Sequence, residues 1–152
     1  MASEAMVYRE MAIVGDDEYL TYLPTVYEWT KGDARFRLVI PAGQNTDLAS
    51  SPWWARLLGF KKEDVRWHRA AKIHDLLCYY IKLYNGVLPK GYYQFWNPLT
   101  NRWENVITPR WKRKEADQLF LKIMLEDGFP PKRAHVAYHA VRTFGGIHMK
   151  FS

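Results

Sequence analysis

A histidine and an aspartate lie side by side in an otherwise apolar stretch, Ile73-His74-Asp75-Leu76-Leu77-Cys78. The spacing of the apolar residues around them predicts a long helix, with His74 in the centre of its apolar stripe and Asp75 on the flank. Burying a polar or charged side chain without a partner is unfavourable, so other parts of the fold must supply partners. The candidates are Asp47, in a loop, and Asp117, in a second helix.

These four residues have the chemistry for hydrolysis. An imidazole whose second nitrogen is oriented by a carboxylate can act as a general base, so His74 and Asp117 are the candidate catalytic residues. Asp47 and Asp75, together with loop carbonyls near Gly43, are the candidate ligands of a hard cation such as Ca²⁺ or Mg²⁺. Such a cation would stabilise the negative charge that develops when His74 activates a water.

Other interpretations of these polar residues stay open. The histidine and the three aspartates could form a buried hydrogen-bond network that ties the loop to the helices without doing chemistry. His68 precedes the His74-Asp75 pair, as in metal-dependent phosphohydrolases, but residues six apart diverge by about 120° around a helix. Cys78 is expected to be a small buried hydrophobe. His135 and His139 are one turn apart on the polar face of a later helix, where we expect them to be exposed.

The elements that must position these residues predict an α+β fold, in which a small N-terminal antiparallel sheet packs on a three-helix C-terminal half. Alternating apolar and aromatic residues favour strands between Met6 and Ile40, with a hairpin turn at 30–33. Proline, glycine and helix-capping residues place the three helices at about 62–84, 108–127 and 131–145, and a short helix at 53–58.

Residues 85–108 predict a β-hairpin inserted between the first two long helices, with arms at 92–96 and 102–106. Its aromatic residues, Tyr92, Tyr93, Trp96 and Trp103, are candidates for a docking surface if they are exposed. Alternatively, the hairpin packs on the core of its own domain.

The composition limits the class of protein. A chain of 152 residues fits one domain over 1–152 and can bury a sizeable core. The net charge of +6 permits a nucleic-acid partner without indicating one, and the basic cluster at 110–114 is either solvated or in contact with an anion. The one cysteine excludes an intramolecular disulfide and a multi-cysteine zinc site. No apolar run approaches the ~18 residues of a membrane span.

Several short motifs follow one another in a recognisable order. They are Ile40-Pro41-Ala42-Gly43, Thr46-Asp47-Leu48-Ala49-Ser50-Ser51-Pro52, Ala70-Ala71, His74-Asp75 with Tyr79, Arg113, Glu115-Ala116-Asp117 with Phe120, Arg133-Ala134, Tyr138, Val141-Arg142 and Phe144-Gly145. In this order the chain, from about Phe36 to Gly145, resembles a family of small proteins of tailed bacteriophages and prophages, catalogued as domain of unknown function thirteen fifty-three. That family usually has an aromatic residue where this chain has Gln44, and a shorter link in place of the 85–108 hairpin.

The resemblance implies a phage origin and leaves the activity open. We therefore expect a virion structural or assembly component, associated with the tail or baseplate, that docks on phage proteins or on itself. The alternative is a phage-encoded hydrolase acting on a lipid, cell-wall or nucleotide substrate. Either would be found in the cytoplasm of the bacterial host during infection, or in the virion.

A weaker, local likeness connects the helix around His74 to the secreted phospholipases. Those enzymes carry a His-Asp pair followed by Cys-Tyr in one helix, an aspartate in an antiparallel helix, and a calcium-binding glycine loop. His74-Asp75, Cys78-Tyr79, Asp117 and Gly43 are similar to these elements. The chain lacks the disulfide framework and the glycine-rich spacing of the calcium loop.

Overall fold

The structure, a computed structural model, describes residues 11–13, 19–21, 24–41, 45–46, 60–61, 64–106 and 110–151, with the backbone alone at 11–13, 19–21, 45–46 and 144–151. The loop residues Gly43 and Asp47, and the short helix expected at 53–58, lie outside these ranges.

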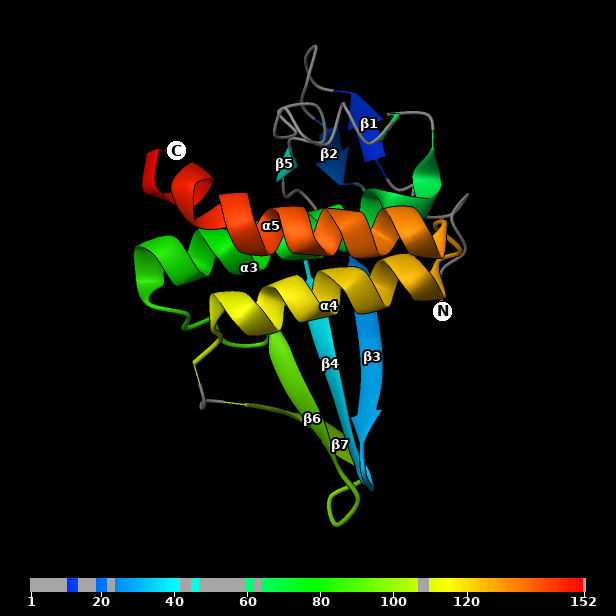
Figure 1. The fold of residues 1–152 in the computed structure, drawn as a ribbon. Coiled ribbons are helices and arrows are strands. Elements are labelled where there is room, and N and C mark those ends of the chain that lie inside the picture. The colour runs from blue at the N-terminus through cyan, green and yellow to red at the C-terminus, as the bar shows by residue number, and fades with distance from the viewer. Residues whose placement is uncertain are drawn as a thin grey trace.

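Two antiparallel sheets form the β part of the fold (Figure 1). The smaller sheet has the order β1-β2-β5, with β1 at Met11–Ile13, β2 at Tyr19–Thr21 and β5 at Asn45–Thr46. The larger sheet has the order β3-β4-β6-β7, with β3 at Thr25–Lys31, β4 at Ala34–Ile40, β6 at Tyr93–Asn97 and β7 at Arg102–Asn105. The turns at the far end of the larger sheet project away from the helices (Figure 1).

The hairpin predicted at 85–108 is confirmed as a hairpin, and it completes the larger sheet. Strand β6 pairs with β4, where Phe36 lies opposite Phe95 and Leu38 opposite Tyr93. Strand β4 is therefore paired on both sides, with β3 and with β6. Because strand pairing across a long sequence separation is a tertiary effect, the sequence predicted the hairpin but not its place in the sheet.

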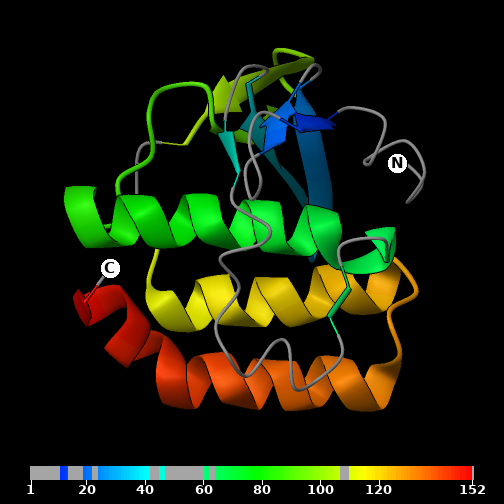
Figure 2. The same cartoon turned by 90° about the horizontal axis from the view of Figure 1, so that it is seen from above.

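Three helices lie side by side, with α4 between α3 and α5 (Figure 2). A short 3-10 turn, η1 at Val65–Trp67, leads into α3 at His68–Tyr84; α4 is Arg113–Glu126 and α5 is Pro131–Phe151. The α+β class and the three C-terminal helices confirm the prediction. None of the helices in the described residues is long and apolar enough to cross a membrane.

Three helix boundaries differ from those predicted. Helix α3 begins at His68 rather than near 62, because the side chain of Asp64 accepts from the backbone N–H of Arg66 and caps the 3-10 turn that comes first. Helix α4 begins at Arg113 rather than near 108, because the backbone N–H of Trp111 donates to the carbonyl of Gly86 at 2.9 Å instead of joining a helix. Helix α5 continues past Gly145 and Gly146 to Phe151. Glycine lowers helix propensity by only about 1 kcal/mol, so it does not by itself end a helix.

The link that leaves α3 is fixed to the segment that enters α4. Asn85 ends α3 in the left-handed conformation at φ 55°, and Gly86 follows at φ 81°. A Cβ atom at Gly86 would lie 2.1 Å from the backbone oxygen of Trp111, so only glycine fits. Together with the Trp111–Gly86 hydrogen bond, this close approach clamps the two ends of the hairpin excursion.

The core lies between the larger sheet and the helices (Figure 1). Its buried hydrophobic residues are Tyr27, Leu38, Ile40, Trp67, Ala70, Ile73, Leu77, Ala116, Leu119, Phe120, Ile123, Met124, Phe129, Ala134, Ala137 and Val141. Five of these residues, Ala116, Leu119, Phe120, Ile123 and Met124, are spaced three and four apart and form one apolar stripe on α4. Burial of this apolar surface is the main force that holds α4 in place.

A buried ion pair also joins α3 to α4. The guanidinium of Arg69 donates to both oxygens of Asp127, from Nε to Oδ2 at 3.0 Å and from Nη2 to Oδ1 at 2.6 Å. The two side chains are only 1% and 7% exposed. The phenol of Tyr27 donates to the neighbouring Glu126 carboxylate, at 3.0 Å to Oε1 and 2.9 Å to Oε2, which ties β3 to the same end of α4.

Candidate functional site

The structure brings His74 and Asp117 together from two antiparallel helices. Nε2 of His74 on α3 lies 2.7 Å from Oδ1 of Asp117 on α4. The hydrophobic core holds the two helices in this register. So does the Arg69–Asp127 ion pair, which lies where α3 begins and α4 ends. The imidazole is 15% exposed whereas the carboxylate is 1% exposed. The histidine is therefore the member of the pair that solvent can reach.

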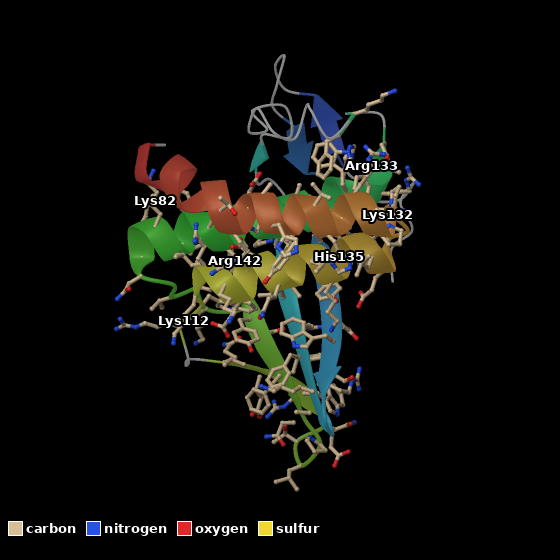
Figure 3. The ribbon with its side chains drawn as sticks, viewed as in Figure 1. Lys82, Lys112, Lys132, Arg133, His135 and Arg142 are labelled. Atoms are coloured by element: carbon tan, nitrogen blue, oxygen red, sulfur yellow. The ribbon has the colours of Figure 1, made fainter. Side chains whose placement is uncertain are left out.

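The second oxygen of Asp117 is bound by an arginine from α5. Nη1 of Arg142 lies 2.9 Å from Oδ2 of Asp117, and the arginine side chain is 31% exposed. Nη2 of Arg113 donates in turn to the backbone oxygen of Arg142 at 3.3 Å. Figure 3 shows Arg142 on α5 where that helix passes α4. All three helices thus meet at one carboxylate, and an acceptor bound on both oxygens is fixed in orientation.

The surroundings of His74 favour its protonated form. Burial lowers the pKa of the imidazole, but the hydrogen bond to Asp117, the nearby Cys78 sulfur and the negative charge of Asp75 together raise that pKa to about 10. The ring of Phe120 packs on the imidazole, with ring centres 4.8 Å apart. When the ring is neutral, the carboxylate of Asp117 can only accept, so the proton stays on Nε2 and the lone pair lies on Nδ1.

Of the candidate cation ligands, the structure describes only Asp75. Asp75 is exposed on α3 next to His74, and it is not among the donor groups that cluster with Asp117. Asp47 and the carbonyls near Gly43 lie outside the described residues. Convergence of all three aspartates on His74 is therefore not observed in the described part of the chain, and the Ca²⁺ or Mg²⁺ site stays a prediction.

A third group at the site is one that sequence reasoning assigned to the core. The sulfur of Cys78 lies 3.6 Å from Nε2 and 3.9 Å from Nδ1 of His74, and the residue is only half-buried. One donor atom each from His74, Cys78 and Asp117 lies within 4.8 Å of the other two. The signal was present in the sequence, because residues four apart on a helix lie on the same face.

The four aromatic residues of the hairpin are all half-buried, and they divide into two groups. Tyr93 packs on the protein itself, against Trp29, Phe36 and Trp111, at ring-centre distances of 5.9, 6.0 and 5.2 Å. Tyr92 packs edge-on against Tyr80, which belongs to α3. For these two residues, the structure favours the interpretation that the hairpin packs on its own domain.

Trp96 and Trp103 lie further along the hairpin and face each other across β6 and β7, with ring centres 5.5 Å apart. The guanidinium of Arg35 lies 5.3 Å from each of the two ring centres, and that of Arg37 lies 4.3 Å from the Trp103 ring. These cation–π contacts cover part of both indoles. The docking role of this pair stays a prediction.

Three other histidines whose side chains the structure describes lie away from the site. His135 and His139 are exposed on α5, as predicted, and His68 is buried at the start of α3 against the ring of Trp67.

The order of elements from β3 to α5, including His74 and Asp117, coincides with a region shared with other proteins. Residues 23–141 match the family described as protein of unknown function (DUF1353). No curated protein and no solved structure matches the chain. Since the match covers more than half of the 152 residues, the chain belongs to the DUF1353 family of proteins of unknown function.

Proposed function

We propose that this DUF1353 protein is a phage-encoded hydrolase in which His74 transfers protons and Asp117 orients its ring. The observation that carries the proposal is the 2.7 Å contact between Nε2 of His74, which is 15% exposed, and Oδ1 of Asp117, which is buried between α3 and α4. A base held by a carboxylate, with its other nitrogen available, is the arrangement that general acid–base catalysis needs.

The role of each group follows from its contacts. Asp117 keeps one proton on Nε2, so Nδ1 is the nitrogen that exchanges a proton with water or substrate. Arg142 holds the carboxylate in place through its second oxygen. Asp75, exposed and adjacent to His74 in sequence, is the group that would bind a hard cation near the substrate. The substrate classes to test are lipids, cell-wall polymers and nucleotides; the weak likeness to the secreted phospholipases is the reason for including phospholipids.

The raised pKa of His74 sets the expected pH dependence. With a pKa of about 10, most of the ring is protonated at neutral pH, so a base that must be neutral gains activity as the pH rises from 7 toward 10. If His74 instead donates its proton to a leaving group, kcat/KM falls over the same interval. The direction of the profile therefore distinguishes the base from the acid.

The test measures hydrolysis by the full-length protein with Ca²⁺, with Mg²⁺ and with a chelator. The substrates are phospholipid vesicles, purified peptidoglycan and nucleotides, and the readouts are released fatty acid, soluble muropeptide and phosphate. His74→Gln should lower the rate on one class by about 10²- to 10⁴-fold. His135→Gln, on the exposed face of α5, is the matched control and should leave the rate unchanged. No hydrolysis of any class, or an equal rate in His74→Gln, would contradict the proposal.

One observation supports the second candidate, a virion component of the tail or baseplate that acts by docking. The tip of the β6–β7 hairpin projects away from the helices and carries Leu99, which is 94% exposed (Figure 1). An exposed leucine beside the Trp96–Trp103 pair is a small apolar surface for a phage protein or a second copy. Mass spectrometry of purified virions tests this candidate, and absence of the polypeptide from particles would contradict it.

A further inference from the structure

The side chains of His74, Cys78 and Asp117 form a donor set that the proposed hydrolysis does not use in full. Acid–base catalysis by His74 and Asp117 gives the cysteine no role, yet its sulfur lies 3.6 Å from Nε2. One nitrogen, one sulfur and one oxygen, all within 4.8 Å of one another, are the ligand types of a catalytic-type zinc site with three protein ligands.

We propose that His74, Cys78 and Asp117 bind a soft divalent transition-metal ion such as Zn²⁺, with the fourth position open to water.

Two of the three separations between donor atoms can be compared with those of a zinc site; the third, between the sulfur and the carboxylate oxygen, is within 4.8 Å. From Zn–N of about 2.0 Å and Zn–S of about 2.3 Å, a tetrahedral site separates the nitrogen and sulfur ligands by roughly 3.5 Å. The observed separation of Nε2 and Sγ is 3.6 Å. The nitrogen and oxygen ligands of such a site would be roughly 3.3 Å apart, so the 2.7 Å contact between Nε2 and Oδ1 would open by about 0.6 Å.

The surrounding structure holds the three ligands in place. His74 and Cys78 are one turn apart on α3, so the helix itself fixes their spacing. Arg142 binds Oδ2 of Asp117 and leaves Oδ1 for the metal, as an outer contact that orients a metal-binding carboxylate does. A thiolate and a carboxylate together neutralise a divalent ion, which limits the electrostatic penalty of placing that ion among partly buried groups.

Metal binding and the acid–base pair exclude each other, because both use Nε2 of His74 and Oδ1 of Asp117. The effect of the metal on activity rests on the proposed function. If the protein is a hydrolase that uses His74, Zn²⁺ should inhibit it, whereas Ca²⁺ and Mg²⁺, which prefer oxygen ligands, should not. The binding test below uses no substrate, so its outcome is independent of whether hydrolysis is found.

The experiment titrates the full-length reduced protein with Co²⁺ as a spectroscopic probe and with Zn²⁺ in competition. Binding at this site should give one ion per chain, a sulfur-to-cobalt charge-transfer band and the intense visible bands of a tetrahedral site. Zn²⁺ should abolish these bands by displacement, and X-ray absorption of the Zn²⁺ form should show one sulfur at about 2.3 Å. A cobalt spectrum without a sulfur band would overturn the proposal.

Two groups of variants locate the site. Cys78→Ser should remove the sulfur band, and Asp117→Asn should weaken Co²⁺ binding by at least about tenfold. The matched control is the pair His135→Gln and His139→Gln, which removes the other histidines one turn apart. Persistence of the sulfur band in Cys78→Ser, or loss of binding in the control, would overturn the assignment.

A second measurement avoids substitution. Because Cys78 is the one cysteine of the chain, alkylation of the native protein reports on its sulfur alone. Zn²⁺ should slow that alkylation at least tenfold and a chelator should restore it; an unchanged rate at saturating Zn²⁺ would contradict binding at this sulfur.

Discussion

Two carboxylates, Asp117 within α4 and Asp127 at its C-terminal cap, tie that helix to α3, and their partners differ in kind. Asp127 meets the guanidinium of Arg69 through two hydrogen bonds, in a place where both side chains are almost fully buried. Asp117 is just as buried, but it meets an imidazole that is 15% exposed and a guanidinium that is 31% exposed. An arginine does not exchange its proton in the physiological range, whereas a histidine does.

The two contacts differ in whether the partner of the aspartate can exchange a proton with solvent. At Arg69 the charge is permanent, the geometry is bidentate and water is excluded, so the pair serves the register of the two helices. At His74 the carboxylate is equally fixed, but its partner has a second nitrogen, 3.9 Å from the sulfur of Cys78, and access to solvent. Burial of the aspartate alone would not have distinguished them; the identity and the exposure of its partner do.

The largest expected loss of stability comes from breaking the Arg69–Asp127 ion pair. Asp127→Ala leaves the guanidinium of Arg69 buried without its counter-charge, so the free energy of unfolding should fall by about 3–5 kcal/mol, as measured by urea denaturation. The double variant Arg69→Met, Asp127→Leu should recover most of the loss, because it removes both charges together. Wild-type stability in the single variant would mean that the pair does not hold the helices.

The next effect concerns pH and should come from the contact between His74 and Asp117. The pKa of His74 is raised from 6.5 to about 10 in the folded protein, so its contribution to stability is complete below pH 6.5 and is lost as the pH rises through about 10. Because one pKa unit corresponds to about 1.4 kcal/mol, the loss should amount to a few kcal/mol. Urea denaturation at several pH values measures it.

The matched measurement uses His74→Gln, which should lack this slope between pH 6.5 and 10. At Asp127, burial raises the carboxyl pKa more than Arg69 lowers it, so the corresponding loss begins above its ordinary value of 3.8, in the acid range. An unchanged alkaline slope in His74→Gln would assign the effect to another group.

A smaller loss of stability should follow from changing the carboxylate of Asp117. Asp117→Asn removes the charge that His74 and Arg142 share, so the pKa of His74 should fall and the free energy of unfolding should drop by about 1.5–3 kcal/mol. The drop should be smaller than in Asp127→Ala, since both partners of Asp117 can turn toward water. An NMR titration of the imidazole measures the pKa, and no change in it would break the comparison.

The smallest effect should come from the contact beside Asp127. Tyr27→Phe removes the hydrogen bond from the buried phenol to Glu126 and should cost about 1 kcal/mol in thermal or urea unfolding. Tyr79→Phe, at an exposed position on α3, is the control and should change stability little. Equal losses in the two variants would show that the Glu126 contact adds nothing to the anchoring of α4.

The sequence predicted those parts of the site that depend on one helix at a time. The apolar stripe of α4 follows from spacings of three and four residues, and Asp117 was a natural partner for His74 because it borders that stripe. The helix end at Asn85-Gly86 followed from the left-handed conformation that these residue types adopt readily.

What the sequence did not predict depends on how helices and strands are placed against one another. Arg142 contacts Asp117 only because α5 passes α4 at that position. Strand β6 pairs with β4, which lies more than fifty residues earlier in the sequence. Periodicity gives the face of an element but not its neighbour, so these contacts were not expected. The contact of Cys78 with His74 was not expected for another reason: the apolar surroundings of Cys78 were given more weight than its one-turn spacing from His74.

The Gly86–Trp111 clamp has a consequence for how this chain can vary. Because the polypeptide leaves and re-enters the helical layer at the same point, residues 87–110 form a closed excursion whose ends are already held together. A replacement of different length would change the loop-closure entropy only slowly, by about 0.6 kcal/mol for each doubling. The excursion is thus a place where sequence can be exchanged while the spacing between α3 and α4, and with it the spacing between His74 and Asp117, stays the same.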